Sequence, residues 1–214
     1  MKIGIFGDSS AVWRPNQDWG YQSYCELVSN YFFDENTINW YGANTGSLPR
    51  TIANIQKHKH LDLYIIFHSK PDYIYSPGWR RDFPLDEIKQ AVKDKKALEA
   101  FKEQLRRHSP FNYDNIKSEL QFWLNTWHNE KLLQLNFVAN LLLLNKLIQG
   151  KTVIHLPRSN VEKQLLTVGT FNDSLQEVLK SAGTHPTYMP REQHDEVAKE
   201  MILTIQKETT ELGL

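Results

Sequence analysis

The sequence lacks the features that would tie it to a disulfide framework or to a charged partner. Its only cysteine, Cys25, cannot form an internal disulfide, which favours a reducing compartment. Its 25 basic residues balance 25 acidic ones, so no excess charge indicates nucleic acid or an anionic membrane surface as a partner. We therefore expect neither a nucleic-acid nor a membrane partner.

Long hydrophobic runs are also missing. The strongest lies within residues 137–148, is interrupted by two asparagines, and falls well below the roughly 20 residues that a membrane span needs. The apolar stretch at residues 1–6 passes directly into a polar turn and is too short for a secretory signal. We therefore expect a soluble, cytoplasmic protein.

What is present is the alternation of strands and helices that is typical of an α/β protein. The 214 residues, of which 40% are hydrophobic, are enough for one substantial core, and we expect a single domain over residues 1–214. Helical patterns separate short apolar segments, so the sequence predicts a parallel sheet covered by helices on both faces. These segments predict buried strands at residues 2–6, 37–41, 63–67 and 152–156.

The region at about residues 72–150 interrupts this alternation. A loop rich in proline and aromatic residues leads into a charged helical stretch at residues 85–108. A second helical stretch, about residues 115–149, becomes apolar toward its end, and Gly150 is a stop signal for it. We interpret the region as an inserted helical layer of the same domain.

Polar residues follow the predicted strands, where an open parallel sheet binds its ligands. Gly7-Asp8-Ser9 follows the first strand, residues 42–47 follow the second, and His68-Ser69-Lys70 follows the third. His185-Pro186 stands near the end of the chain. A serine becomes a nucleophile when a base accepts its proton and nearby donors meet the developing oxyanion. Ser9 is the candidate nucleophile.

These residues resemble the SGNH hydrolase family, also called GDSL esterases and lipases. Gly7, Asp8 and Ser9 match its first block, Gly46 (or else Gly42) its second, and His185-Pro186 its last. The resemblance implies a three-layer flavodoxin-like sheet. It also implies an esterase that acts on a small or carbohydrate ester through a Ser9 acyl-enzyme, with His185 as base, Gly46 in the oxyanion hole and neither metal nor organic cofactor.

Two positions depart from the family pattern. The asparagine of its third block is missing after the third strand, where Ser69 or Lys70 would have to donate to the oxyanion instead. The acid that precedes the family's histidine falls on Ala182. Either Ser9 and its base act as a dyad, another acid such as Asp173 substitutes, or the activity is weak.

Several alternatives stay open at this point. His194, at the start of the last predicted helix, can take the place of His185 as base. Asp8 and Ser9 can be a helix cap rather than catalytic groups. The missing asparagine and acid are also compatible with a non-catalytic SGNH-like domain for binding or assembly. A weaker alternative is a nucleotide or phosphate binder that holds its anion at the turn after the first strand.

Overall fold

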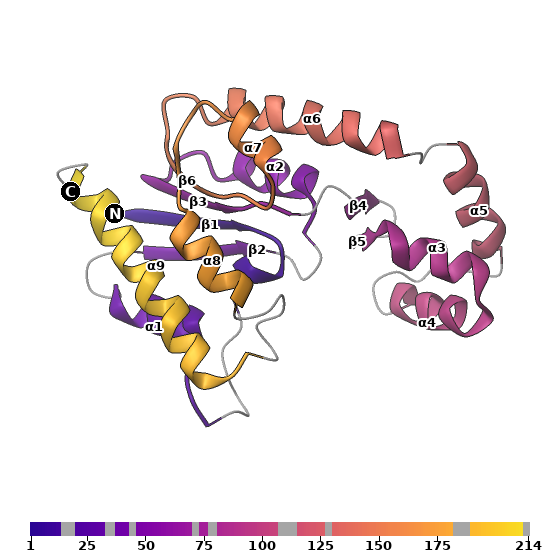
Figure 1. Ribbon diagram of the computed structural model, residues 1–214, viewed down its shortest axis with the longest axis horizontal. Helices are drawn as coiled ribbons and strands as arrows, with labels where there is room; N and C mark the ends of the chain where they lie inside the picture. Colours follow the sequence, from indigo (N-terminus) through magenta and orange to yellow (C-terminus); the bar gives the residue numbers. More distant parts are fainter. Residues whose placement is uncertain are drawn as a thin grey trace.

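A five-stranded parallel sheet forms the centre of the structure, which is a computed structural model (Figure 1). The structure describes residues 1–13, 20–32, 37–42, 46–69, 73–76, 81–106, 115–126, 130–181 and 189–211. The strand order is β2-β1-β3-β6-β7, which is the flavodoxin-like order of doubly wound sheets. The strands are β1 (Lys2–Gly7), β2 (Thr37–Gly42), β3 (Leu63–Phe67), β6 (Thr152–Leu156) and β7 (Thr170–Phe171).

The α/β fold and the four predicted strands are confirmed, but β2 was wrongly expected to be buried: it is an edge strand, and its residues are half-buried or exposed. β7 was not predicted, because two residues carry no readable alternation. The parallel pairs β1–β2, β1–β3, β3–β6 and β6–β7 bring every carboxyl end to one edge of the sheet. Because β1 pairs with both β2 and β3, the segments that follow these three strands are neighbours.

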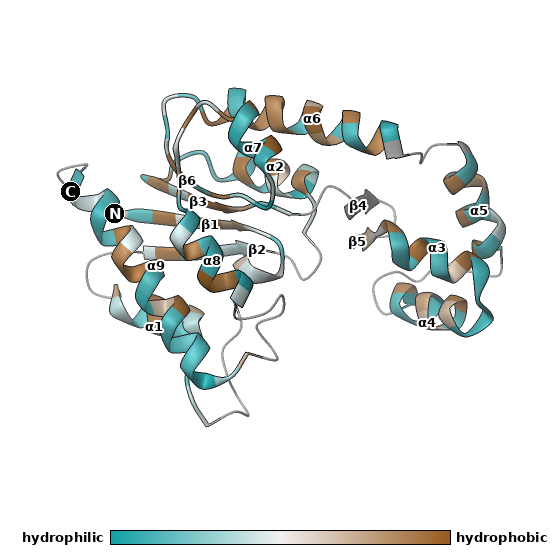
Figure 2. Cartoon of the chain, viewed as in Figure 1, coloured by the Kyte–Doolittle hydropathy of each residue, from teal (hydrophilic) through white to brown (hydrophobic). Residues whose placement is uncertain are grey.

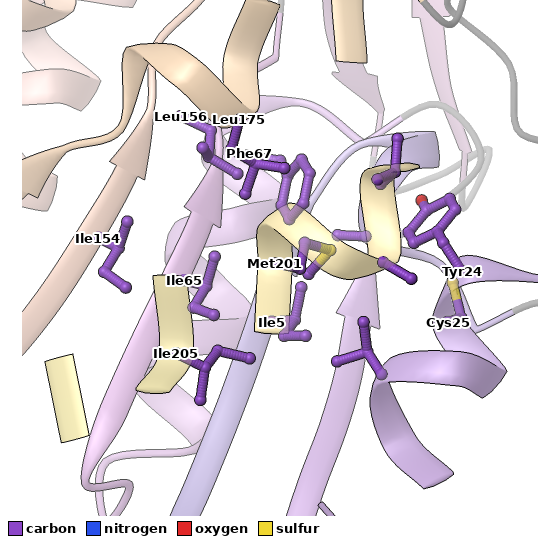
Figure 3. Close-up of a cluster of buried hydrophobic side chains, with 14 of the residues drawn as sticks. Ile5, Tyr24, Cys25, Ile65, Phe67, Ile154, Leu156, Leu175, Met201 and Ile205 are labelled. Carbon is purple, nitrogen blue, oxygen red and sulfur yellow. The ribbon is translucent and has the colours of Figure 1, made fainter. Parts of the chain in front are cut away.

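Helices cover both faces of the sheet and make three layers (Figure 1). On one face, Ile5 and Ile65 of the strands pack with Met201 and Ile205 of the last helix (Figure 3). On the other face, Phe6 packs with apolar residues of the opposite helices. The first face carries α1 (Tyr24–Tyr31), α8 (Asp173–Ser181) and α9 (Arg191–Glu211), and the second carries α2 (Leu48–Lys57), α6 (Glu130–Leu147) and α7 (Asn160–Leu165).

The predicted inserted region consists of two parts in the structure. Its first part is an antiparallel hairpin followed by three helices, which gather around Phe83, Phe101 and Leu105 in an apolar cluster of their own, at a distance from the sheet (Figure 1). These elements are β4 (Tyr73–Ser76), β5 (Arg81–Pro84), α3 (Leu85–Lys93), α4 (Lys95–Arg106) and α5 (Ile116–Thr126).

The second part is α6, which leads from this cluster back to the sheet and is followed in the chain by β6. Leu141 and Leu144 of α6 are buried against the sheet and α2. The helix is apolar on more than one side (Figure 2), and Leu135 and Leu142 are exposed. In the ranges that the structure describes, no helix is both long and apolar enough to cross a membrane.

Candidate functional site

The turn after β1 depends on a glycine. Gly7 has a φ of +140°, which favours glycine, and a Cβ atom there would lie 2.2 Å from the carbonyl oxygen of Phe67. The carboxyl ends of β1 and β3 therefore lie too close together for any residue other than glycine at position 7. The chain then turns through a short 3-10 helix, η1 (Ser9–Ala11), directly at the edge where ligands bind in such sheets.

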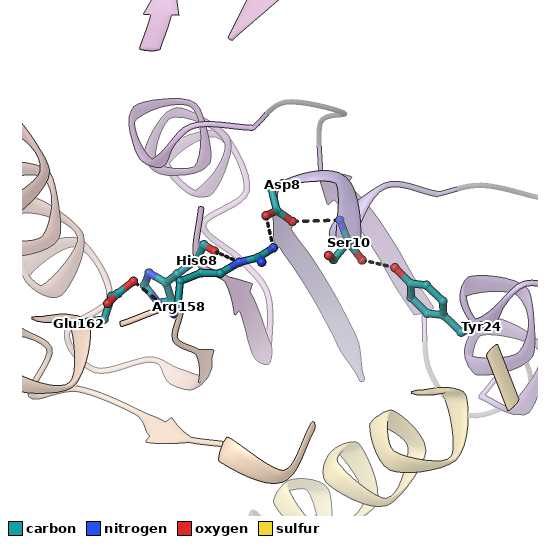
Figure 4. A network of polar contacts seen from close by, with 6 residues as sticks. All are labelled: Asp8, Ser10, Tyr24, His68, Arg158 and Glu162. Carbon is teal, nitrogen blue, oxygen red and sulfur yellow. Dashed lines mark hydrogen bonds and ion pairs between the residues drawn. The ribbon is translucent and has the colours of Figure 1, made fainter. Parts of the chain in front are cut away.

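Asp8 fixes this turn with both of its carboxylate oxygens (Figure 4). Oδ1 accepts a hydrogen bond of 2.9 Å from the backbone N–H of Ser10, so Asp8 is the N-cap of η1, as one of the alternatives supposed. Oδ2 lies 2.6 Å from Nη2 of Arg158. The hydroxyl of Tyr24 donates to the carbonyl oxygen of Ser10. Ser9 thus stands between two anchored residues, and its own side chain lies outside the described part of the structure.

Gly46 brings the loop after β2 against this turn. A Cβ atom at Gly46 would lie 2.4 Å from the carbonyl oxygen of Gly7 and 3.1 Å from Cα of Asp8. Gly42, the other candidate for the oxyanion glycine, lies instead against the backbone of Ala11. Gly46 is therefore the glycine that adjoins the residues before Ser9.

Ser69 follows β3, the strand next to β1. Gly7 pairs with Phe67 in the parallel register, so Asp8 and His68 follow neighbouring ends of the two strands. Ser69 is 1% exposed, and its Oγ has no hydrogen-bond partner among the described residues. A buried hydroxyl without a partner is costly, which marks it as a group that can serve a ligand. Lys70, the other candidate donor, lies outside the described residues.

His194 is buried where α9 meets α1. Its Nδ1 accepts a hydrogen bond of 3.1 Å from the backbone N–H of Tyr24, the first residue of α1, and its ring stacks on the Tyr24 ring. Because a backbone N–H can only donate, Nδ1 is the acceptor, and the neutral ring carries its proton on Nε2. His194 therefore stabilises the start of α1. His185 lies outside the described residues.

Asp173, considered as a substitute acid, is bound elsewhere. Its Oδ2 lies 2.6 Å from Nζ of Lys163, and its side chain is 59% exposed. It follows β7 at the edge of the sheet, whereas Ser9 follows β1, which is three strands away. This exposed ion pair is a surface contact between α7 and α8.

The sequence did not lead us to predict Arg158 as a site residue, although it follows a predicted strand, as the other candidate residues do. It lies two residues beyond the end of β6. Its guanidinium binds Asp8 and also donates from Nε to the carbonyl oxygen of His68, at 3.1 Å (Figure 4). Its side chain is 20% exposed. Because residues 157–159 follow a predicted strand, inspection of that loop would have found Arg158.

His155 was also missed, because it lies inside β6 rather than after it. It forms a buried pair with His68, with 2.9 Å between His68 Nε2 and His155 Nδ1. Burial lowers the pKa of His68 well below 6.5, and the neighbouring His155 adds to the effect. Burial lowers the pKa of His155 to about 4, against the opposing effect of its hydrogen bond to the carbonyl oxygen of Val168. Both rings are neutral at pH 7.

No protein-family model and no curated protein matches this sequence. Its chemistry therefore has to be inferred from the site itself. At the carboxyl edge of the sheet, the described loops join a capped Gly-Asp-Ser turn, a close-packed glycine, a buried serine hydroxyl and an arginine.

Proposed function

We propose that the protein is an SGNH-like serine hydrolase that acts on a small or carbohydrate ester, with Ser9 as the nucleophile. The observation that carries the proposal is the Gly7-Asp8-Ser9 turn. It stands at the carboxyl end of the inner strand β1, between β2 and β3, and Asp8 and Ser10 hold it on either side of Ser9. A nucleophile needs such a rigid position at the edge where ligands bind.

The reaction has two balanced steps. In the first, the Ser9 hydroxyl transfers its proton to His185 while Oγ bonds to the ester carbonyl carbon, and the alcohol leaves with the proton that His185 returns. In the second, His185 removes a proton from water, the water oxygen displaces Ser9 Oγ from the acyl carbon, and the proton passes back to the serine. No metal or organic cofactor takes part.

The neighbouring loops supply candidate donors for the oxyanion. A hydroxyl at Ser69 that has no partner within the described residues can donate to a developing negative charge without first breaking another bond. The backbone of Gly46 adjoins the same turn. We propose Ser69, together with the backbone N–H groups of Ser9 and Gly46, in place of the family asparagine, and Lys70 as a further donor.

His185 is the better candidate for the base. The Nδ1 lone pair of His194 is bound to the N–H of Tyr24, and in that tautomer Nε2 carries a proton and cannot accept one. Asp173 is paired with Lys163, so we propose a Ser9–His185 dyad rather than a triad.

The same geometry favours a hydrolase over a phosphate binder. In the turn after β1, the N–H of Ser10 is already bound to the Asp8 carboxylate. The N–H that a phosphate would need at this turn is therefore already occupied. The other alternative, a non-catalytic binding domain, is distinguished from an enzyme by the assay of ester hydrolysis described next.

The test is hydrolysis of short acyl esters and of acetylated sugars by the purified protein and three variants. We expect activity in the wild type and its loss in Ser9→Ala. Ser69→Ala, which removes one proposed oxyanion donor, should lower the rate by at most about 10²–10³-fold. Ser174→Ala, which removes an exposed hydroxyl bonded to Glu200, is the matched control and should keep the wild-type rate. An inactive, folded wild type, or full activity in Ser9→Ala, would refute the proposal.

A further inference from the structure

Arg158 joins the three loops that surround the candidate nucleophile (Figure 4). It belongs to the loop after β6, binds the Asp8 carboxylate after β1 at 2.6 Å, and donates to the His68 carbonyl after β3 at 3.1 Å. Two different guanidinium nitrogens make these bonds, so the plane of the group is fixed in two directions. A single contact would leave the side chain free to rotate.

The backbone of Arg158 is itself anchored. Glu162 is fully buried, and its Oε1 accepts from the N–H of Arg158 at 3.3 Å. Its Oε2 accepts from the N–H and the hydroxyl of Ser159, which is the N-cap of α7. This capping box holds the start of α7 and the residue before it as one unit. Arg158 therefore reaches Asp8 from a rigid base.

The two oxygens of Asp8 have separate tasks. Oδ1 binds the N–H of Ser10 inside the turn, and Oδ2 binds Arg158 outside it. Arg158 thereby limits the rotation of the Asp8 side chain that caps the turn. The backbone of Ser9 lies between the capping residue and the capped N–H, so its position depends on this rotation.

We infer that Arg158 is a positioning residue, which acts through Asp8 to hold the Ser9 turn in its reactive geometry. The inference rests on the proposed function for its catalytic consequence, but the geometric part of it can be measured separately. The alternative is an ion pair that adds little to stability and has no effect on the turn, as is common for exposed pairs.

The experiment measures two quantities in the full chain. One is the rate at which a fluorophosphonate probe labels Ser9, followed by peptide mass spectrometry. The other is the hydrogen-exchange rate of the η1 turn. The variants are Arg158→Met, Arg158→Lys and Asp8→Asn. The control is Lys102→Met, which breaks a 3.0 Å ion pair with Glu99 in the remote helix α4 and removes a cation of similar burial (16% exposed).

We expect Arg158→Met and Asp8→Asn to slow labelling by about ten- to a hundred-fold and to speed exchange in the turn, since small displacements of a nucleophile have effects of this size. Arg158→Lys should recover part of the rate, because an ammonium can bind Asp8 but lacks the fork that also reaches the His68 carbonyl. Lys102→Met should change neither quantity. If Arg158→Met does not fold, Arg158→Lys and Asp8→Asn decide the question.

The outcomes separate the two claims. If the wild type is labelled at Ser9 and the Arg158 variants match it in both labelling and exchange, the positioning role is wrong and the proposed function stands. If Ser9 is never labelled but exchange of the turn rises in Arg158→Met, the geometric role stands and the hydrolase is wrong.

Discussion

Nε2 of His68 lies 2.9 Å from Nδ1 of His155, inside the sheet and next to the candidate site. The bond has a defined direction. Nε2 of His155 lies 2.9 Å from the carbonyl oxygen of Val168, which can only accept, so that nitrogen carries the proton. Nδ1 of His155 is then the acceptor, and His68 donates to it from Nε2. The pair is a fixed chain of two neutral imidazoles.

This pair predicts a loss of stability in acid. Both histidines have pKa values in the folded state below their ordinary 6.5, so unfolding takes up protons at low pH. Their contribution is complete above about pH 6.5 and is lost as the pH falls toward 4. For His155 alone, a pKa near 4 corresponds to a loss on the order of 3 kcal/mol by pH 4.

Thermal unfolding between pH 7 and pH 4 measures this effect. His155→Asn cannot titrate, yet its side-chain oxygen can accept from His68, so we expect it to reduce the slope of stability against pH below 6.5. Equal slopes in the variant and the wild type would mean that His155 contributes nothing to the acid sensitivity.

A second prediction concerns the close contact of Gly46 with Gly7. Gly46→Ala places a methyl group 2.4 Å from a backbone oxygen, which cannot move aside as a flexible side chain can. We expect a loss of about 1–3 kcal/mol in unfolding free energy, typical of overpacking, and a lower rate of Ser9 labelling. Chemical denaturation and probe labelling measure the two effects.

Gly20→Ala is the matched control. Gly20 has a φ of +71° and open space around a Cβ atom, so alanine there is strained without displacing a neighbour. We expect a loss of about 1–2 kcal/mol and an unchanged labelling rate. A labelling rate that falls equally in both variants would show that lower stability, rather than the contact with Gly7, controls the site.

Some of this arrangement is readable in the sequence because it depends on local patterns. The apolar segments at residues 2–6 and 63–67 predict β1 and β3, since buried parallel strands consist of continuous apolar residues. The polar turn at Gly7 then marks the edge of the sheet where ligands bind. The fold class and the place of the candidate site follow from these two facts.

Other parts depend on contacts between distant residues and are not readable. The bond between Asp8 and Arg158 joins positions 150 residues apart, and only the strand order brings them together. The burial of His194 against Tyr24 likewise depends on how α9 packs on α1. Local patterns also cannot show that the helices α3, α4 and α5 form a cluster away from the sheet.

The two candidate histidines should respond differently to substitution. His194→Ala removes the acceptor of the Tyr24 N–H and leaves a buried donor unpaired, at a cost of about 1–3 kcal/mol. His194→Asn should restore much of this loss, because its side-chain oxygen can take the place of Nδ1. His185→Ala should instead abolish ester hydrolysis with little change in stability. Denaturation and ester assays of the three variants check the assignment, and the opposite pattern would make His194 the base.

A substitution in the apolar core of the cluster formed by α3, α4 and α5 should unfold this cluster without affecting the candidate site. The rings of Phe83 and Phe101 lie 4.7 Å apart at its centre, and both are buried. Phe101→Ala should cost about 3–5 kcal/mol, mostly in the local stability of these helices. Hydrogen exchange should accelerate in α3 and α4, while β1 and β3 stay protected. Equal acceleration in the sheet would show that the cluster and the sheet unfold together.

Covalent labelling shows whether Ser9 is the nucleophile. The wild-type protein is incubated with a fluorophosphonate, and the modified peptide is identified by mass spectrometry, with Ser9→Ala treated in parallel. We predict one adduct, on Ser9, which is absent from Ser9→Ala and much slower to form in His185→Ala. A folded wild type that takes up no probe, or a Ser9→Ala variant that is labelled as the wild type is, would contradict this prediction.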